Sequence, residues 1–185
     1  MKEAQDLRAG NTVKVGNDLF MVLKMTYNKG ARSASVVRLK MKNLGTNGVS
    51  EVVHKASDKF EDIVLETRKM QYLYANDGLY TFMDQENYEQ LELNKDDLGD
   101  AVGYLKEQMG LDIVMYGAKA VGVQLPIEAD YEIIYTEPAV KGDTSGKVLK
   151  TAKLDTGLEI QVPLYCAQGE RVIVDTRTGE FVKRA

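Results

Sequence analysis

The sequence predicts a mainly β protein composed of small β-barrels. Most of the chain falls into short apolar runs separated by turn sequences such as "NDG" at residues 76–78, and this pattern is typical of strands joined by hairpins. Only one segment, at residues 95–110, has the apolar spacing of a helix. Many short strands with one short helix favour small barrels over a sandwich of long strands.

A long hairpin is predicted in the first third of the chain. The stretch "TVKVGNDLFMVLKMTY" has two apolar runs divided by the turn sequence "GND". After it, "SVVRLKMKNL" alternates apolar and basic residues, which places Val37, Leu39 and Met41 on one face of a strand. The opposite face carries Arg38, Lys40 and Lys42. We therefore expect strands at residues 20–27 and 35–42.

The tip of this hairpin holds one long cation among small residues. Arg32 is flanked by Gly30, Ala31, Ser33 and Ala34, so the backbone there is slender enough to enter a narrow channel. The basic face of the second strand suits a phosphate backbone. The same spacing also suits an ordinary solvated hairpin whose charges protect an edge strand, and from spacing alone both interpretations stay open.

The remaining elements follow in order along the chain. Further strands are predicted at residues 50–56, 63–76, 78–84, 88–93, 112–126, 131–137, 157–166, 170–177 and 179–184. The segment "KDDLGDAVGYLKEQMG" is predicted to form a helix, with Asp96 or Asp97 as its N-cap and Gly110 as its stop.

Two joints, near residues 61–64 and 127–130, are expected to divide the chain into thirds. The segments "VGVQLP" at 121–126 and "LEIQVP" at 158–163 share an apolar pattern with glutamine and proline at the same positions. This faint echo favours related barrels in the second and third parts. Units of about 60 residues are marginal alone, so we expect the joints to be packed.

Charge is distributed unevenly along the chain. The net charge is −4, but the first 64 residues carry +4, the next 63 carry −6 and the last 58 carry −2. A basic end on an acidic body favours a protein that meets phosphate at one end only, although random surface variation accounts for the same numbers.

The residue inventory argues against an enzyme. One cysteine, Cys166, and one histidine, His54, cannot form a disulfide framework or a usual zinc site. Cys166 follows an apolar run, where a thiol usually packs as a small hydrophobe, and no nucleotide-binding glycine loop is present. Without an apolar leader or membrane span, we expect a cytoplasmic protein with no membrane partner.

Two further stretches are richer than packing requires. In "AVKGDTSGKVLKTAKL", glycines bracket short polar side chains and lysines surround them, a composition that suits a phosphate or a base edge but also a plain long turn. The C-terminal "DTRTGEFVKRA" reads as a strand, a turn and a strand that ends with Lys183 and Arg184.

These stretches together resemble one family, bacterial elongation factor P. "KGDTSGK" at 141–147 is similar to a loop of the family's third domain, and "KTAKLDTGLEIQVPLYCAQG" at 150–169 is similar to its most diagnostic stretch. "DTRTGEF" resembles its C-terminal hairpin and "LRAG" its N-terminus. The resemblance covers essentially the whole chain.

The resemblance implies a KOW/SH3-like domain at residues 1–64 and OB-fold domains at 65–127 and 128–185, in an L-shaped arrangement resembling tRNA. It implies a translation elongation factor, not an enzyme, that binds both ribosomal subunits between the peptidyl and exit sites. There the factor would promote peptide bond formation at consecutive prolines by positioning the acceptor end of the peptidyl-tRNA. A monomer is expected.

Site residues follow from the same resemblance. Arg32 stands where much of the family has a modified lysine, and it resembles the branch whose arginine receives rhamnose from an arginine rhamnosyltransferase. No other cofactor or metal is expected. The tip and arm residues expected to contact RNA are Lys29, Gly30, Ser33, Arg38, Lys40 and Lys42, and Arg32 is expected to contact the acceptor end of the tRNA. The loop residues Gly142, Asp143 and Thr144 are expected near the mRNA in the exit site, and Arg184 is expected to contact RNA.

Two alternatives stay open. An elongation-factor-P-like paralogue can also carry a tip arginine, but the intact "GDT" loop at 142–144 argues against it. A general single-stranded RNA-binding OB module would expose aromatics among basic residues. Here the aromatics of the acidic middle third are expected in cores and joints; they are Tyr72, Tyr74, Tyr80, Phe82, Tyr88 and Tyr104.

Overall fold

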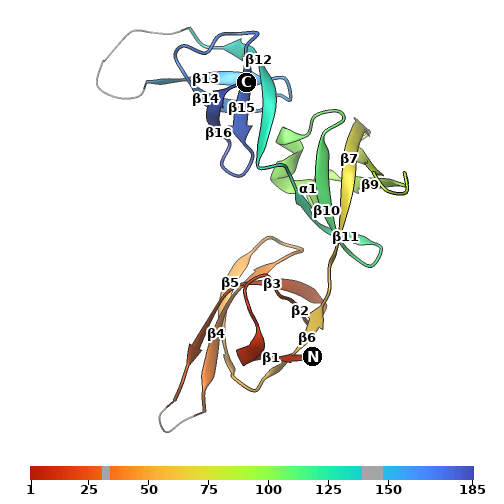
Figure 1. Cartoon of the computed structure of the whole chain (residues 1–185), viewed down its shortest axis with the longest axis vertical. Helices are drawn as coiled ribbons and strands as arrows, with labels where there is room; N and C mark the ends of the chain where they lie inside the picture. Colours follow the sequence, from red (N-terminus) through yellow and green to blue (C-terminus); the bar gives the residue numbers. More distant parts are fainter. Residues whose placement is uncertain (31–33, 139–147) are drawn as a thin grey trace. The chain divides into compact units, whose positions relative to one another are not determined.

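The computed structural model describes residues 1–30, 34–138 and 148–185, which form three β-sheets (Figure 1). Two compact units result: residues 1–67 with 114–122, and residues 68–113 with 123–185. The mainly β class and the succession of three small curled sheets are as the sequence predicts. The domain boundaries and the L-shaped arrangement stay predictions.

The first sheet has six strands in the order β1-β6-β2-β3-β4-β5. In chain order its elements are β1 (Lys2–Glu3), the 3-10 turn η1 (Ala4–Asp6), β2 (Thr12–Val15), β3 (Asp18–Asn28), β4 (Val36–Asn43), β5 (Val49–Lys55) and β6 (Lys59–Ile63). The predicted long hairpin is confirmed as β3 and β4, and β5 pairs along the other side of β4 (Figure 1). Val37, Leu39 and Met41 of β4 lie in the core, as their alternation predicts.

The second sheet has the order β11-β10-β7-β8-β9 and the third has β14-β13-β12-β15-β16. The second contains β7 (Glu66–Asn76), β8 (Leu79–Asp84), β9 (Gln90–Asn94), β10 (Gly110–Tyr116) and β11 (Lys119–Gln124). The third contains β12 (Glu128–Thr136), β13 (Leu149–Leu154), β14 (Glu159–Pro163), β15 (Arg171–Asp175) and β16 (Glu180–Arg184).

These two sheets share one connectivity. In each, the first strand in the chain is central, the second and third lie on one side of it, and the fourth and fifth lie on the other. The repeated pattern at residues 121–126 and 158–163 predicts that the second and third sheets are related, but it does not match equivalent strands. Its two segments fall on β11 and β14, which are the fifth strand of one sheet and the third strand of the other.

The predicted 16-residue helix is wrong. The structure has one turn of α-helix, α1 (Lys95–Leu98), followed by the 3-10 helix η2 (Gly99–Tyr104). Asn94, not Asp96 or Asp97, is the N-cap: its side chain accepts a hydrogen bond from the Asp97 backbone at 2.9 Å, and Asp97 accepts one from the Asn94 backbone at 3.3 Å. Gly99 then takes a φ of +56°, which ends the α-helix. Gly110 begins β10.

Strand β13 is a second departure from the prediction, because the sequence pattern places "LKTAKL" in the polar loop. Ala152 and Leu154 are fully buried. Lys150, predicted to be one of the lysines around that loop, is 9% exposed and belongs to the strand.

The joint between the second and third sheets is packed. The Tyr131 hydroxyl donates a hydrogen bond to the Tyr104 carbonyl at 2.8 Å, and burial raises the pKa of Tyr131 well above its ordinary value. Lys106 donates to the Asp130 carbonyl at 3.0 Å, and Asp130 also pairs with Arg171. Tyr104 packs against the core of the third sheet. The expectation of a packed joint is met here.

We expect Gly179→Ala to weaken this joint. Gly179 has a φ of +74°, and a Cβ atom there would stand 2.9 Å from the Tyr104 hydroxyl oxygen. The left-handed backbone alone costs an alanine about 1 kcal/mol. Gly16→Ala is a matched control, because Gly16 has a φ of +63° with open space around it. Urea unfolding should show a larger loss for Gly179→Ala; equal losses would mean that the tyrosine contact contributes nothing.

Candidate nucleic-acid interface

A bulge in β3 determines which of its side chains face outward. Phe20, Val22 and Met25 all pack on the core, although strict alternation would place Met25 on the opposite face from Val22. The register between β3 and β4 shifts between Val22 and Lys24, so the extra residue, Leu23, reverses the alternation. Consequently Lys24, Thr26 and Asn28 lie on the exposed face beside the cations of β4.

The exposed face of the hairpin is a shallow polar groove of about 310 Å³. It is lined by Lys24, Thr26, Asn28, Arg38, Lys40 and Glu51. Lys24 lies directly opposite Lys40 in the β3–β4 register, an arrangement of like charges that destabilises a sheet. Arg38 pairs with Glu51 at 3.3 Å. Among the described residues, no ion pair joins Lys24 or Lys40 to a carboxylate. The ammonium groups of both lysines are therefore available to bind an anion.

The structure places only some of the predicted tip residues. Lys29 is exposed and Gly30 half-buried just after β3, and Lys42 is half-buried on the same face of β4 as Arg38 and Lys40. Arg32 and Ser33 lie outside the described residues. The sequence does not predict that Lys24, Thr26 and Asn28 belong to this face. The spacing of three between Val22 and Met25 was the one available signal, and it reads as a bulge only once β4 is known to pair there.

The predicted exit-site loop residues Gly142, Asp143 and Thr144 also lie outside the described residues. Arg184, the predicted C-terminal contact residue, lies within the described part of the chain, whereas its contact with RNA stays a prediction. Arg184 of β16 pairs with Glu170 at 3.3 Å, and its guanidinium lies 4.7 Å from the centre of the Tyr165 ring. Its side chain keeps 53% exposure. Arg184 is therefore held by its own domain before it meets any partner.

The turn before β16 contains a bidentate ion pair. Arg177 donates to the two carboxylate oxygens of Asp175, through Nε at 3.1 Å and Nη2 at 2.6 Å. This side-chain hydrogen bonding, together with the Arg177 backbone N–H, lowers the pKa of Asp175 to about 2. Because the folded pKa lies below the ordinary value of about 3.9, the pair stabilises the fold above that pH and loses its contribution as pH falls towards 2.

We expect Arg177→Ala to raise the pKa of Asp175 back towards its ordinary value. A carboxylate-detected NMR titration from pH 1.5 to 6 would follow it. Arg171→Ala is the matched control, because Arg171 also lies in the third domain but pairs with Asp130. If the pKa of Asp175 stays near 2 in Arg177→Ala, backbone N–H donors alone are enough to keep that pKa low.

Side chains that could react are engaged in packing. Cys166 is 1% exposed, and burial raises the pKa of its thiol. His54 of β5 is half-exposed, lies 3.3 Å from Asp58 and stacks edge-on against Phe60. The described part of the chain contains no group of three or more metal-binding side chains. Within the same residues, no helix is long and apolar enough to cross a membrane.

The aromatics of the second sheet divide into two groups. Tyr72 and Phe82 are buried and Tyr104 is in the joint, as expected. Tyr74 and Tyr88 are 50% and 69% exposed, so their assignment to a core is wrong. They belong to the most acidic third of the chain, and this charge opposes binding of a phosphate backbone.

Comparison with solved structures shows which known folds this chain resembles. A structure titled eukaryotic translation initiation factor 5A, from Methanococcus jannaschii, matches 67% of this chain and 91% of its own, with a TM-score of 0.54 and 20% identity. A translation initiation factor eIF-5A family protein from Naegleria fowleri matches 66% of this chain and 93% of its own, with a TM-score of 0.52 and 12% identity. At these identities the likeness concerns the fold alone, which is that of a multi-domain β protein.

Sequence comparison gives the family. Models of the elongation factor P KOW-like, OB and C-terminal domains match residues 3–60, 65–123 and 129–184, in that order. Elongation factor P of Fusobacterium nucleatum is 53% identical over all of this chain and 98% of its own length. That of Bordetella parapertussis is 52% identical over all of this chain and 99% of its own. The chain belongs to the elongation factor P family, whose members are translation factors and not enzymes.

Proposed function

We propose that this protein binds the ribosome between the peptidyl and exit sites and promotes peptide bond formation at consecutive prolines. The observation that carries the proposal is the match of all three family domains in order along the whole chain. The curated relatives bear the name elongation factor P and not that of a paralogue. The basic outer face of the β3–β4 hairpin supports an RNA partner for the first domain.

The contribution of the protein is positional. Proline is a cyclic secondary amine and a poor nucleophile, so the reaction is sensitive to the alignment of the peptidyl ester. Holding the acceptor end of the peptidyl-tRNA in place lowers the entropic part of the barrier without acid–base chemistry. The exposed lysines of the groove would hold the phosphate backbone, and the hairpin tip would reach the acceptor end.

Arg32 is the proposed contact at the tip and the proposed site of modification. Its guanidinium is always charged, delocalised and a weak nucleophile, so a dedicated rhamnosyltransferase would be needed to modify it. Rhamnose would lengthen the arm and add hydroxyl groups. We propose that the tip and arm contact RNA through Lys29, Gly30, Ser33, Arg38, Lys40 and Lys42. Gly142, Asp143 and Thr144 would contact the mRNA in the exit site, and Arg184 would contact RNA.

Mass analysis tests the modification. Protein purified from its own cells should be heavier by one deoxyhexose, and peptide fragmentation should place the added mass on Arg32. Protein made in a heterologous host that lacks the transferase is the control and should have the mass of the bare chain. An unmodified Arg32 in the native protein would contradict this part of the proposal and leave the ribosomal role standing.

The wider setting follows from the same proposal. A ribosomal factor of this kind would act in the cytoplasm, as a monomer, without a membrane partner. The competing function is a general single-stranded RNA-binding module. Cosedimentation with ribosomes separates the two: the proposed factor should bind ribosomes carrying peptidyl-tRNA and leave free RNA oligomers unbound at physiological salt. Equal binding to both would favour the RNA module.

A further inference from the structure

The basic groove of the first sheet contains a carboxylate. The described residues that line the groove include three cations, Lys24, Arg38 and Lys40, and one acidic residue, Glu51. Glu51 belongs to β5, which pairs with β4 on the side opposite β3. A carboxylate repels a phosphate backbone, whereas the three cations attract it. Glu51 therefore lowers the affinity of this groove for RNA.

Glu51 is placed against two of the three cations. Its Oε1 atom lies 3.3 Å from Nε of Arg38. In the register of β4 and β5, Glu51 lies directly opposite Lys40, and Lys40 in turn lies directly opposite Lys24 of β3. One row across the three strands is thus lysine, lysine and glutamate. The carboxylate offsets part of the positive charge at the centre of the groove.

The ion pair between Arg38 and Glu51 can be exchanged for a pair with phosphate. The two side chains are 55% and 50% exposed, and an ion pair at such exposure changes an equilibrium at most about fivefold. A phosphate binds the same N–H donors of a guanidinium as a carboxylate does. Every RNA that reaches Arg38 loses some affinity in this exchange. A ligand with several other contacts to the protein stays bound despite that loss, whereas a ligand held only at the groove does not.

We propose that Glu51 is a specificity-determining residue that keeps the groove from binding free RNA. The inference rests on the RNA-binding role proposed above for this face of the hairpin. In the free protein, Glu51 holds Arg38 and offsets the charge of Lys40, so a single strand of RNA binds poorly at physiological salt. On the ribosome, where other parts of the chain are also in contact, a phosphate replaces Glu51 at the guanidinium.

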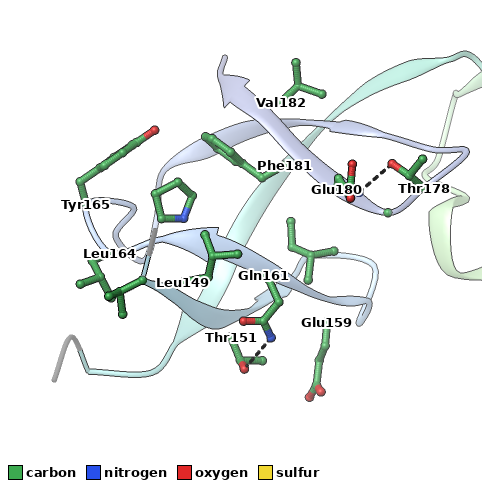
Figure 2. A pocket seen from close by; sticks show the side chains of 14 residues that line it. Leu149, Thr151, Glu159, Gln161, Leu164, Tyr165, Thr178, Glu180, Phe181 and Val182 are labelled. Atoms are coloured by element: carbon green, nitrogen blue, oxygen red, sulfur yellow. Dashed lines mark hydrogen bonds between the residues drawn. The ribbon is translucent and has the colours of Figure 1, made fainter. Parts of the chain in front are cut away.

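The third sheet provides a matched glutamate. Glu159 of β14 is exposed and lies directly opposite Lys153 of β13, just as Glu51 lies opposite Lys40. Figure 2 shows Glu159 beside a hollow of about 1250 Å³, and the described residues that line this hollow include no lysine or arginine. Glu159→Gln therefore makes the same change in net charge, next to the same type of cross-strand partner, away from a cationic groove.

Binding of a short oligouridylate to the full chain, measured at several salt concentrations, tests the proposal. Glu51→Gln should bind the oligouridylate about threefold more tightly than the unaltered chain at low salt. Its slope of log affinity against log salt should be steeper by about 0.7, because Arg38 gains one phosphate contact on a single strand. Glu159→Gln should match the unaltered chain, and Glu51→Asp should stay close to it because the carboxylate is kept.

Two results would overturn the proposal. One is an affinity of Glu51→Gln that does not exceed that of Glu159→Gln, which includes the case that neither variant binds the oligouridylate at low salt. The other concerns Arg38→Gln combined with Glu51→Gln. This double variant should lose the gain in salt slope, since the guanidinium that makes the new contact is absent; a slope as steep as that of Glu51→Gln alone would place the contact elsewhere. Urea unfolding checks that each variant is folded.

Ribosome cosedimentation distinguishes this inference from the proposed function. Glu51→Gln should still sediment with ribosomes carrying peptidyl-tRNA, and it should also bind the oligouridylate at a salt concentration where the unaltered chain binds only ribosomes. If the unaltered chain binds ribosomes and Glu51→Gln gains nothing on free RNA, the role of Glu51 is refuted and the proposed function stands. If the gain on free RNA appears but ribosomes are not bound, the role of Glu51 is supported and the proposed function is refuted.

Discussion

Replacing Arg32 with alanine is expected to return synthesis through a run of prolines to the rate without the factor. The physical reason is orientation: a misplacement of about 1 Å in a reacting group costs on the order of 10²-fold in rate, and the proposed tip cation is what steadies the acceptor end. Its neighbours at the tip are small and cannot replace it. The measurement is a reconstituted translation assay that follows formation of a triproline peptide.

Controls make this result specific. Arg177→Ala removes an exposed arginine that pairs with Asp175 in the third domain, and it should leave proline synthesis unchanged. Arg32→Lys keeps a positive charge but loses the planar guanidinium and the rhamnose acceptor, so it should rescue synthesis only in part. Ribosome cosedimentation should be nearly unchanged in Arg32→Ala. Full rescue by Arg32→Ala would remove the tip from the mechanism.

The double substitution Lys24→Gln with Lys40→Gln is expected to stabilise the fold and weaken ribosome binding. Lys24 and Lys40 lie directly opposite each other across β3 and β4, so relief of their repulsion should raise the free energy of unfolding. The gain should be at most about 0.5 kcal/mol, because Lys40 also loses its attraction to Glu51, which lies directly opposite it in β5. Loss of two phosphate contacts should lower the slope of log affinity against log salt by about 1.5. A substitution that raises the free energy of unfolding and lowers the affinity for the ribosome indicates residues whose role is to bind a ligand.

Urea unfolding and ribosome binding at several salt concentrations measure the two effects. The control is Lys95→Gln with Lys119→Gln, which removes the same charge from exposed positions in α1 and β11. It should leave the salt slope close to that of the unaltered protein. An unchanged slope in Lys24→Gln with Lys40→Gln would mean that the groove faces solvent on the ribosome and that its lysines do not contact phosphate.

The features of the fold that can be predicted from the sequence are those that depend only on residues close together in the chain. The alternation in β4 is a property of the strand itself, because successive side chains point to opposite faces. Turns at "GND" and "NDG" follow from residues that tolerate a positive φ: Gly16, Asp77 and Gly78 have values of +63°, +49° and +79°. The burial of Cys166 follows from the apolar run before it.

Other features depend on pairing between distant segments. Apolar spacing favours a long helix at residues 95–110, but Gly99 and the packing of Tyr104 against the third sheet limit it to short turns. Lys150 reads as a loop residue until β12 and β14 are known to flank its strand. The outward face of Lys24 requires the bulge at Leu23, which exists only in the register with β4.

By itself, then, the sequence determined a mainly β chain of the elongation factor P family with a basic hairpin, because hydrophobic period, turn residues and specific motifs are local properties. Only the tertiary structure decided that Lys24 joins Lys40 on the exposed face. This feature arises from how β3 and β4 pair, and pairing is decided by the burial of side chains from distant parts of the chain.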